Sequence, residues 1–132
     1  MQAVMKTTEA AAKSLVKTLP ITASVFTGID NETKLAPCVI IQAESATEEF
    51  PFSGLFFVKT KIRIKEMAAD TDTDSGLSKT VFDAFMDSNI ATNLAAQTSS
   101  YSVASVWVDN AENSIEGDAC VQDMTFNVVC GL

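Results

Sequence analysis

The side chains that most often perform catalysis are scarce in this sequence of 132 residues, which contains no histidine. Without an imidazole there is no serine–histidine or cysteine–histidine nucleophile pair, no histidine acid–base group and no imidazole metal ligand. Carboxylates remain, but most of the 17 acidic residues fall in expected loops or on expected solvated faces. Such positions do not separate two carboxyl pKa values, as acid–base catalysis requires. We therefore expect no catalytic residue and no enzyme, with a carboxylate-based hydrolase as a minor alternative.

The acidic run that contains Asp70, Asp72 and Asp74 resembles the opening of a calcium-binding EF-hand loop. The glycine expected at the sixth position of such a loop is Ser75, and the bidentate glutamate expected at the twelfth is Val81. The pattern instead favours a solvated loop before a helix that Asp74 or Ser75 caps. The cysteines lack zinc-site spacing, and the five glycines form no phosphate loop or dinucleotide fingerprint. We expect no metal and no cofactor.

The odd number of cysteines favours reduced thiols over a disulfide framework. Cys120 and Cys130 fall on one expected strand, which separates them by about 33 Å at about 3.3 Å per residue, too far for a disulfide. A disulfide with Cys38 stays open. The amino terminus has no pattern of a secretion signal, and no segment approaches the roughly 20 apolar residues of a membrane helix. These features predict folding in a cytoplasm and no membrane contact.

Length and composition predict a single domain over residues 1–132, because 47% hydrophobic residues suffice for one core. The nine basic and 17 acidic residues give a net charge of −8. The average surface therefore repels nucleic acid at long range. We expect no specific nucleic-acid partner.

The first half of the chain has the pattern of a helix followed by strands. Apolar residues at helical spacing predict an amphipathic helix over residues 2–19, and Pro20 follows where the helix must stop. β-rich runs at 21–27 and 37–43 predict two strands, paired as a hairpin or lying as neighbours. The stretch 44–54, polar and then interrupted by proline and glycine, predicts a long connection.

The second half begins with the best-defined strand, predicted over residues 55–66 by a clear alternation of apolar and polar residues. An apolar stripe predicts a second helix over 77–86. The further expected elements are one or two helical turns at 90–96, a strand at 101–108, a turn region at 109–118 and a long last strand at 120–130. Together these elements predict an α+β fold of two layers, a mostly antiparallel sheet with two main helices packed on one face.

One face of the strand at 55–66 is basic. Its basic residues are Lys59, Lys61, Arg63 and Lys65, and they project opposite the apolar residues Phe56, Val58, Ile62 and Ile64. Like charges two residues apart repel, so something must compensate them. Either the lysines protect an edge strand, or the row pairs with acids of a neighbouring strand. The functional alternative is a contact with the next copy of the chain, with the acidic run at 70–74 as a partner surface. DNA contact ranks third, because no aromatic residues interleave with the basic ones.

Phe50 and Phe52 flank a proline in the expected connection. Two phenylalanines in a connection must be shielded from water. Either they fold back onto the core of their own chain, or they insert into a pocket of a partner. We keep both alternatives. The candidate subunit-interface residues are thus Lys59, Lys61, Arg63, Lys65, Asp70, Asp72, Asp74, Phe50 and Phe52.

The order of elements resembles that of a known family, the tail terminator and head–tail joining (neck) proteins of tailed bacteriophages. The resemblance spans nearly the whole chain and is one of architecture. It rests on the first helix ending near Leu19 and Pro20, a strand such as 56–64 followed by an acidic loop, a helix of the 77–86 kind and a last pair of strands joined by a turn such as 113–118.

This resemblance implies a structural protein of the virion that forms a ring, usually a hexamer in terminators, ends polymerisation of the tail tube and joins the tail to the head. It implies contacts with copies of itself, with the tail tube protein and with a head-connector or adaptor protein. It also implies a place in the tail or neck of a virion assembled in the host cytoplasm. The alternative hypothesis is a small α+β ligand-binding or regulatory module, which would enclose an apolar pocket with converging polar groups.

Overall fold

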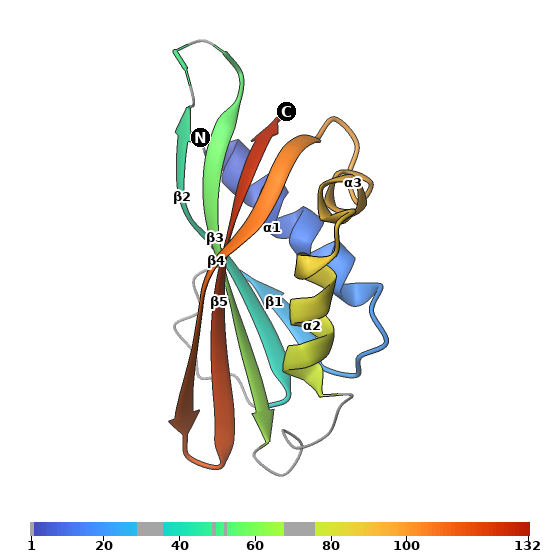
Figure 1. Ribbon diagram of the computed structural model, residues 1–132, viewed down its shortest axis with the longest axis vertical. Coiled ribbons are helices and arrows are strands. Elements are labelled where there is room, and N and C mark those ends of the chain that lie inside the picture. Colours follow the sequence, from blue (N-terminus) through green and yellow to red (C-terminus); the bar gives the residue numbers. More distant parts are fainter. Residues whose placement is uncertain (1, 29–35, 49, 52, 68–75) are drawn as a thin grey trace.

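The computed structural model describes residues 2–28, 36–48, 50–51, 53–67 and 76–132. Their strands form one sheet, and their helices pack on one of its faces (Figure 1). The expected α+β fold of two layers is confirmed. In chain order the elements are α1 (Gln2–Lys17), β1 (Ser24–Thr27), β2 (Cys38–Glu48), β3 (Phe56–Met67), α2 (Leu77–Met86), α3 (Ile90–Ala95), β4 (Ser102–Glu116) and β5 (Ala119–Gly131).

The strands follow the order β1-β2-β3-β5-β4, which places β3 at the centre of the sheet. β1 runs parallel to β2, and all other neighbouring strands are antiparallel. The strands expected at 21–27 and 37–43 are therefore parallel neighbours and not a hairpin. β3 forms backbone pairs with β2 on one side and β5 on the other along nearly its whole length.

The alternation of β3 determines which face of the sheet becomes the core. Val58, Ile62 and Ile64 are buried on the helix side, and the basic row lies on the other face, as the sequence predicts. We call this second face, which the described helices leave uncovered, the open face.

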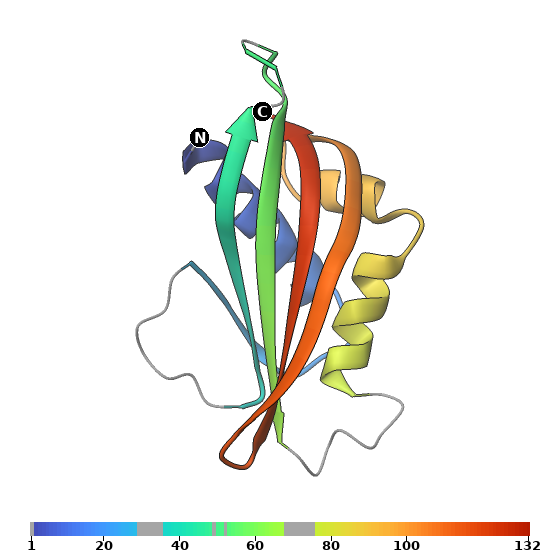
Figure 2. The same ribbon diagram turned by 60° about the vertical axis from the view of Figure 1, so that its left-hand side comes forward.

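α1 contributes one apolar face to the core. Its buried residues recur at three- and four-residue intervals and pack against β1, β2 and β3. The helix ends at Lys17, and a tighter final turn leads to Pro20. Figure 2 shows α1 crossing behind the strands. No described helix is long and apolar enough to cross a lipid bilayer.

α2 and α3 complete the helical layer beside β3 and β4. The ring centroids of Phe85 in α2 and Phe126 in β5 lie 4.7 Å apart, and Leu94 of α3 is fully buried. An aromatic contact of this kind contributes about 1 kcal/mol beyond the burial of its surface. The helices expected at 77–86 and 90–96 are confirmed.

β2 is longer than expected. The sequence predicts a connection over 44–54, but β2 continues to Glu48 and pairs with the first half of β3. A register irregularity between Ala43 and Ser45 allows this extension. Such a bulge absorbs one residue and lets a polar segment keep its backbone hydrogen bonds.

β4 is also longer than expected. The turn region predicted at 109–118 is in fact strand as far as Glu116, and only Gly117 and Asp118 form the turn. Gly117 has a φ of +61°, which suits glycine best. The polar composition of this segment disfavours a strand, but continuous pairing with β5 outweighs that preference.

The amino terminus of α2 is capped by a residue from another element. The expected caps, Asp74 and Ser75, are wrong, because the N-cap position is Gly76, which has no side chain to accept a hydrogen bond. The carboxylate of Glu66 in β3 accepts hydrogen bonds from the backbone N–H of Ser78 (3.1 Å) and from its hydroxyl (2.8 Å). A carboxylate at this end of a helix also interacts favourably with the helix dipole.

Two buried threonines provide a matched test of this core. Thr60 of β3 and Thr8 of α1 are both fully buried, but the hydroxyl of Thr60 has no hydrogen-bond partner among the described residues. Thr8 donates to the carbonyl of Val4 (2.8 Å), and its oxygen lies 2.9 Å from the hydroxyl of Tyr101.

We expect Thr60→Val to leave the free energy of unfolding unchanged or to raise it by about 1 kcal/mol, because valine removes an unsatisfied buried hydroxyl without changing shape. Thr8→Val should lower it by about 1–2 kcal/mol, because the buried Tyr101 hydroxyl loses its hydrogen bond with Thr8. Urea unfolding measures both values. A Thr60→Val chain that is less stable than Thr8→Val would show that the packing described for β3 is incorrect.

Candidate functional site

The open face combines charged and aromatic side chains from three neighbouring strands. These are the central strand β3, its neighbour β5 and the edge strand β4. In the register of the sheet Arg63 stands opposite Asp123, and Lys59 stands opposite Asn127. Trp107 of β4 is the neighbour of Asn127 on its other side. The open face is therefore the surface on which the expected basic row lies.

An ion-pair network holds the middle of the open face. Nε of Arg63 lies 2.8 Å from Oδ1 of Asp123, and Nη2 donates to Oδ2 at 3.0 Å. Nζ of Lys61 lies 3.6 Å from the same Oδ2. The guanidinium thus binds the carboxylate in the bidentate geometry that gives the strongest of such pairs.

The basic row is compensated from within the chain. In addition to the contacts with Asp123, Nζ of Lys65 lies 3.3 Å from Oε1 of Glu116 in β4, and its side chain is almost entirely buried. β3 is the central strand, so protection of a sheet edge is the wrong explanation for the row. Lys59 has no ion pair with any described residue.

The network shifts the pKa values of its members. Burial by itself raises the pKa of Asp123, but the hydrogen bond and charge of Arg63, together with Lys61, outweigh burial and hold the pKa below its ordinary value. The hydrogen bond to Asp123 raises the pKa of Arg63. Both shifts stabilise the charged forms, so the pair is structural and has no group ready to exchange a proton near neutral pH.

An aromatic pair lies further along the open face, beyond the ion pairs. The ring centroids of Phe57 and Trp107 are 5.5 Å apart with the planes tilted by 58°, and Trp107 remains 40% exposed. Phe57 stands opposite Val129 in β5. Sequence reasoning did not single out Trp107, although its place between Val106 and Val108 is the signal of a side chain facing away from the core.

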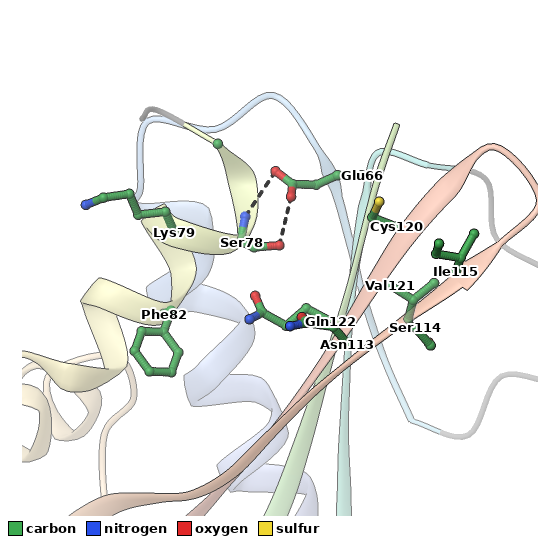
Figure 3. Close-up of a pocket in the computed structure, with 11 residues that line it drawn as sticks. Glu66, Ser78, Lys79, Phe82, Asn113, Ser114, Ile115, Cys120, Val121 and Gln122 are labelled. Atoms are coloured by element: carbon green, nitrogen blue, oxygen red, sulfur yellow. Dashed lines mark hydrogen bonds between the residues drawn. The ribbon is translucent and has the colours of Figure 1, made fainter. Parts of the chain in front are cut away.

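A cavity of about 600 Å³ lies on the helix side, where the β4–β5 hairpin extends past α2 (Figure 3). Glu66 and Ser78 line one wall, and Asn113 and Gln122, which are opposite one another in the sheet, line another. Glu66 is the one carboxylate among the described lining residues, and it is already bonded to Ser78. The described cavity walls therefore lack the pair of carboxylates that a hydrolase would need.

The thiols do not form a reactive site. The structure describes all three cysteines, and each is a free thiol. Sγ of the buried Cys130 lies 3.8 Å from the hydroxyl oxygen of Thr8. Burial raises the pKa of Cys130, which keeps its thiol neutral and poorly nucleophilic. Within the described part of the chain, no group of cysteine and acidic residues has the geometry to hold a metal ion.

The phenylalanine and acidic candidates are placed only in part. Phe50 lies beyond the end of β2 and is 68% exposed, so it does not fold back onto the core. Phe52 and the acidic residues Asp70, Asp72 and Asp74 lie outside the described residues.

No protein-family model matches the chain, and no curated protein matches its sequence. Among solved structures, a chain from the "Virion of native gene transfer agent (GTA) particle" has a similar fold. The two are 17% identical, the alignment covers 100% of this chain and 95% of that chain, and the TM-score is 0.60. The likeness shows that the two chains share a fold over nearly their whole lengths.

The Arg63–Asp123 pair gives a pH-dependent prediction. Because the pKa of the folded carboxyl is depressed, the stability it provides is fully present above the unfolded value of about 3.9 and is lost as the pH falls through the folded value. At pH 7 we expect Asp123→Asn to lower the free energy of unfolding by about 1 kcal/mol. The difference from the wild type should shrink as the pH falls below the unfolded pKa and through the lower folded pKa of Asp123.

Urea unfolding from pH 7 to pH 2.5 measures this difference. Asp83→Asn is the matched control, since Asp83 also pairs with a lysine (2.8 Å) but on a well-exposed helical surface. Its effect should be much smaller. An Asp123→Asn difference that persists unchanged in acid would contradict the assignment.

Proposed function

We propose that this chain is a structural subunit of a phage-like virion, of the ring-forming tail terminator or neck type. The observation that supports the proposal most is the likeness of fold to a chain of a gene transfer agent virion, which covers essentially both chains. The order of elements in the sequence suggests the same family. In this role copies form a ring, hexameric in terminators, that ends the tail tube and joins it to the head.

The open face supports a role in assembly. It presents an aromatic pair, Phe57 and Trp107, beside a polar and charged area. An aromatic anchor with a polar rim is the usual anatomy of a protein–protein contact. We propose that another protein of the particle, the tail tube or the head connector, covers this face. Exposed Phe50 is proposed as a second anchor.

The basic row contributes less to the proposed subunit contacts than the sequence alone suggests. Lys61, Arg63 and Lys65 already have acidic partners in their own chain. Reversing Lys61 or Arg63 would place an acid beside Asp123 and weaken the fold itself. Lys59 is the member of the row best suited to meet an acid of a neighbouring subunit.

A ligand-binding module is the second candidate, and the cavity beneath α2 is the observation that favours it. Its polar groups Asn113 and Gln122 face the first turn of α2, as Figure 3 shows. A strictly monomeric protein that is stabilised against heat by a small metabolite would support this candidate over an assembly role.

Removal of the gene product from the particle tests the proposed role. We expect particles made without this protein to have tails of abnormal length or heads without tails, because nothing would end the tube or join it. Electron microscopy measures both defects. Particles of normal length, fully tailed and infectious, would contradict the proposal.

Truncation of the aromatic anchor tests the open face. Trp107→Ala should lower the affinity for the rest of the particle by about 30-fold, the effect expected of a central anchor. Met86→Ala is the control, since Met86 is also exposed but lies on α2. The amount of each variant in purified particles, with its unfolding measured separately, gives the result. Equal incorporation of both variants would exclude the open face as the contact.

A further inference from the structure

Charge is segregated along this chain. Every lysine and arginine lies within the first 79 residues, so residues 80–132 contain no basic side chain at all. The β4–β5 hairpin therefore has acids without basic residues of its own. Its acids at 109–118 are Asp109, Glu112, Glu116 and Asp118.

The acidic part of this hairpin is exposed to solvent. All residues from 109 to 118 are exposed, and Ile115 is 80% exposed. β4 is the last strand in the sheet order, so the outer side of its backbone has no strand partner within the described residues. Acidic side chains on such an edge prevent indiscriminate pairing with other strands but leave the edge available to a basic surface.

The outer face of α1 has the opposite charge. Lys6, Lys13 and Lys17 recur after seven and four residues, which places them on one side of the helix, away from the buried face. No described acid forms an ion pair with these lysines. The one acid of this helix, Glu9, accepts a hydrogen bond from the backbone N–H of Ala43 (2.7 Å).

These two surfaces belong to different sides of the molecule. α1 packs over β1, β2 and β3, whereas β4 is the far edge of the sheet. The lysine row is about 17 Å long at 1.5 Å per helical residue, and the strand from Asp109 to Glu116 is about 23 Å long at 3.3 Å per residue. The acidic strand is thus long enough to span the whole lysine row, and the two are opposite in sign, but one chain cannot bring them together.

We propose that the acidic β4–β5 hairpin of one copy packs on the lysine face of α1 in the next copy. The contact joins two different surfaces, so repetition gives a head-to-tail series that forms a ring when the rotation closes. Exposed Ala10 and Ser14 lie between the lysines and allow the strand edge to approach the helix closely. This inference rests on the proposed function only in that copies of the chain must meet.

Charge reversal on each surface, alone and combined, tests the contact. One variant contains Asp109→Lys and Glu112→Lys, the second contains Lys6→Glu and Lys13→Glu, and the third contains all four changes. Glu116 is left unchanged because it pairs with Lys65. The control, Glu44→Lys with Asp87→Lys, changes the net charge as the first variant does, but at other exposed sites whose acids form no ion pair with a described residue.

Mass photometry at low salt and occupancy in purified particles measure assembly. We expect each two-residue variant to weaken assembly at least tenfold, the combined variant to restore it and the control to match the wild type. Assembly of the wild type should weaken with added salt. Two-residue variants that assemble normally, or a combined variant that folds but does not recover, overturn the contact.

A covalent test does not depend on the charged variants. Under mild oxidation a chain with Ala10→Cys and Ser114→Cys should form a ladder of linked copies, whereas each single variant should give dimers at most. Absence of the ladder in an assembled protein overturns the contact alone. A wild-type chain that is monomeric in solution and absent from particles overturns the proposed function as well.

Discussion

β3 forms backbone hydrogen bonds on both of its sides, and its side chains alternate between the helical layer and the open face. A shift of one residue against a neighbouring strand would turn lysines into the core and expose Val58, Ile62 and Ile64. Because a buried unpaired charge costs several kcal/mol, the apolar residues of β3 determine the register of the whole sheet. The Arg63–Asp123 pair selects the same register from the other face, since it requires these two residues to stand opposite each other.

Two carboxylates connect the helical layer to the sheet through the backbone. β1 pairs with β2 only as far as Ile41, and the backbone N–H of the buried Ala43 just beyond donates a hydrogen bond to Glu9 of α1. At the other end of the sheet, Glu66 of β3 binds the first turn of α2. In both places an acid satisfies a donor that its own element leaves unpaired. These contacts hold α1 and α2 in position while leaving the opposite face of the sheet uncovered.

The elements that sequence could predict are those with a strong periodicity. α1, α2 and β3 have apolar residues at regular intervals, and the basic row of β3 was predicted on the correct face. The distal half of β4 could not be predicted, because a segment such as Asp109 to Glu116 has no intrinsic preference for a strand and depends on backbone pairing with β5. The individual acidic partners of the basic row could not be predicted from the sequence either. Arg63 and Asp123 are 60 residues apart in the chain, and their contact follows from the sheet order, which periodicity does not encode.

The exposed apolar side chains are distributed in a way that favours assembly over chemistry. Phe50 lies beyond β2 and Trp107 on the open face, whereas Ile115 of the β4–β5 hairpin lines the cavity beside α2, so the three lie in different regions of the surface and only one of them is at the cavity. A ligand-binding module or an enzyme gathers such side chains around one pocket. A subunit of the proposed ring needs separate anchors, because such a subunit meets a copy on each side and other proteins above and below. In the proposed assembly, the segregation of lysines from the acidic hairpin gives the contacts a direction, since like surfaces repel and unlike surfaces attract.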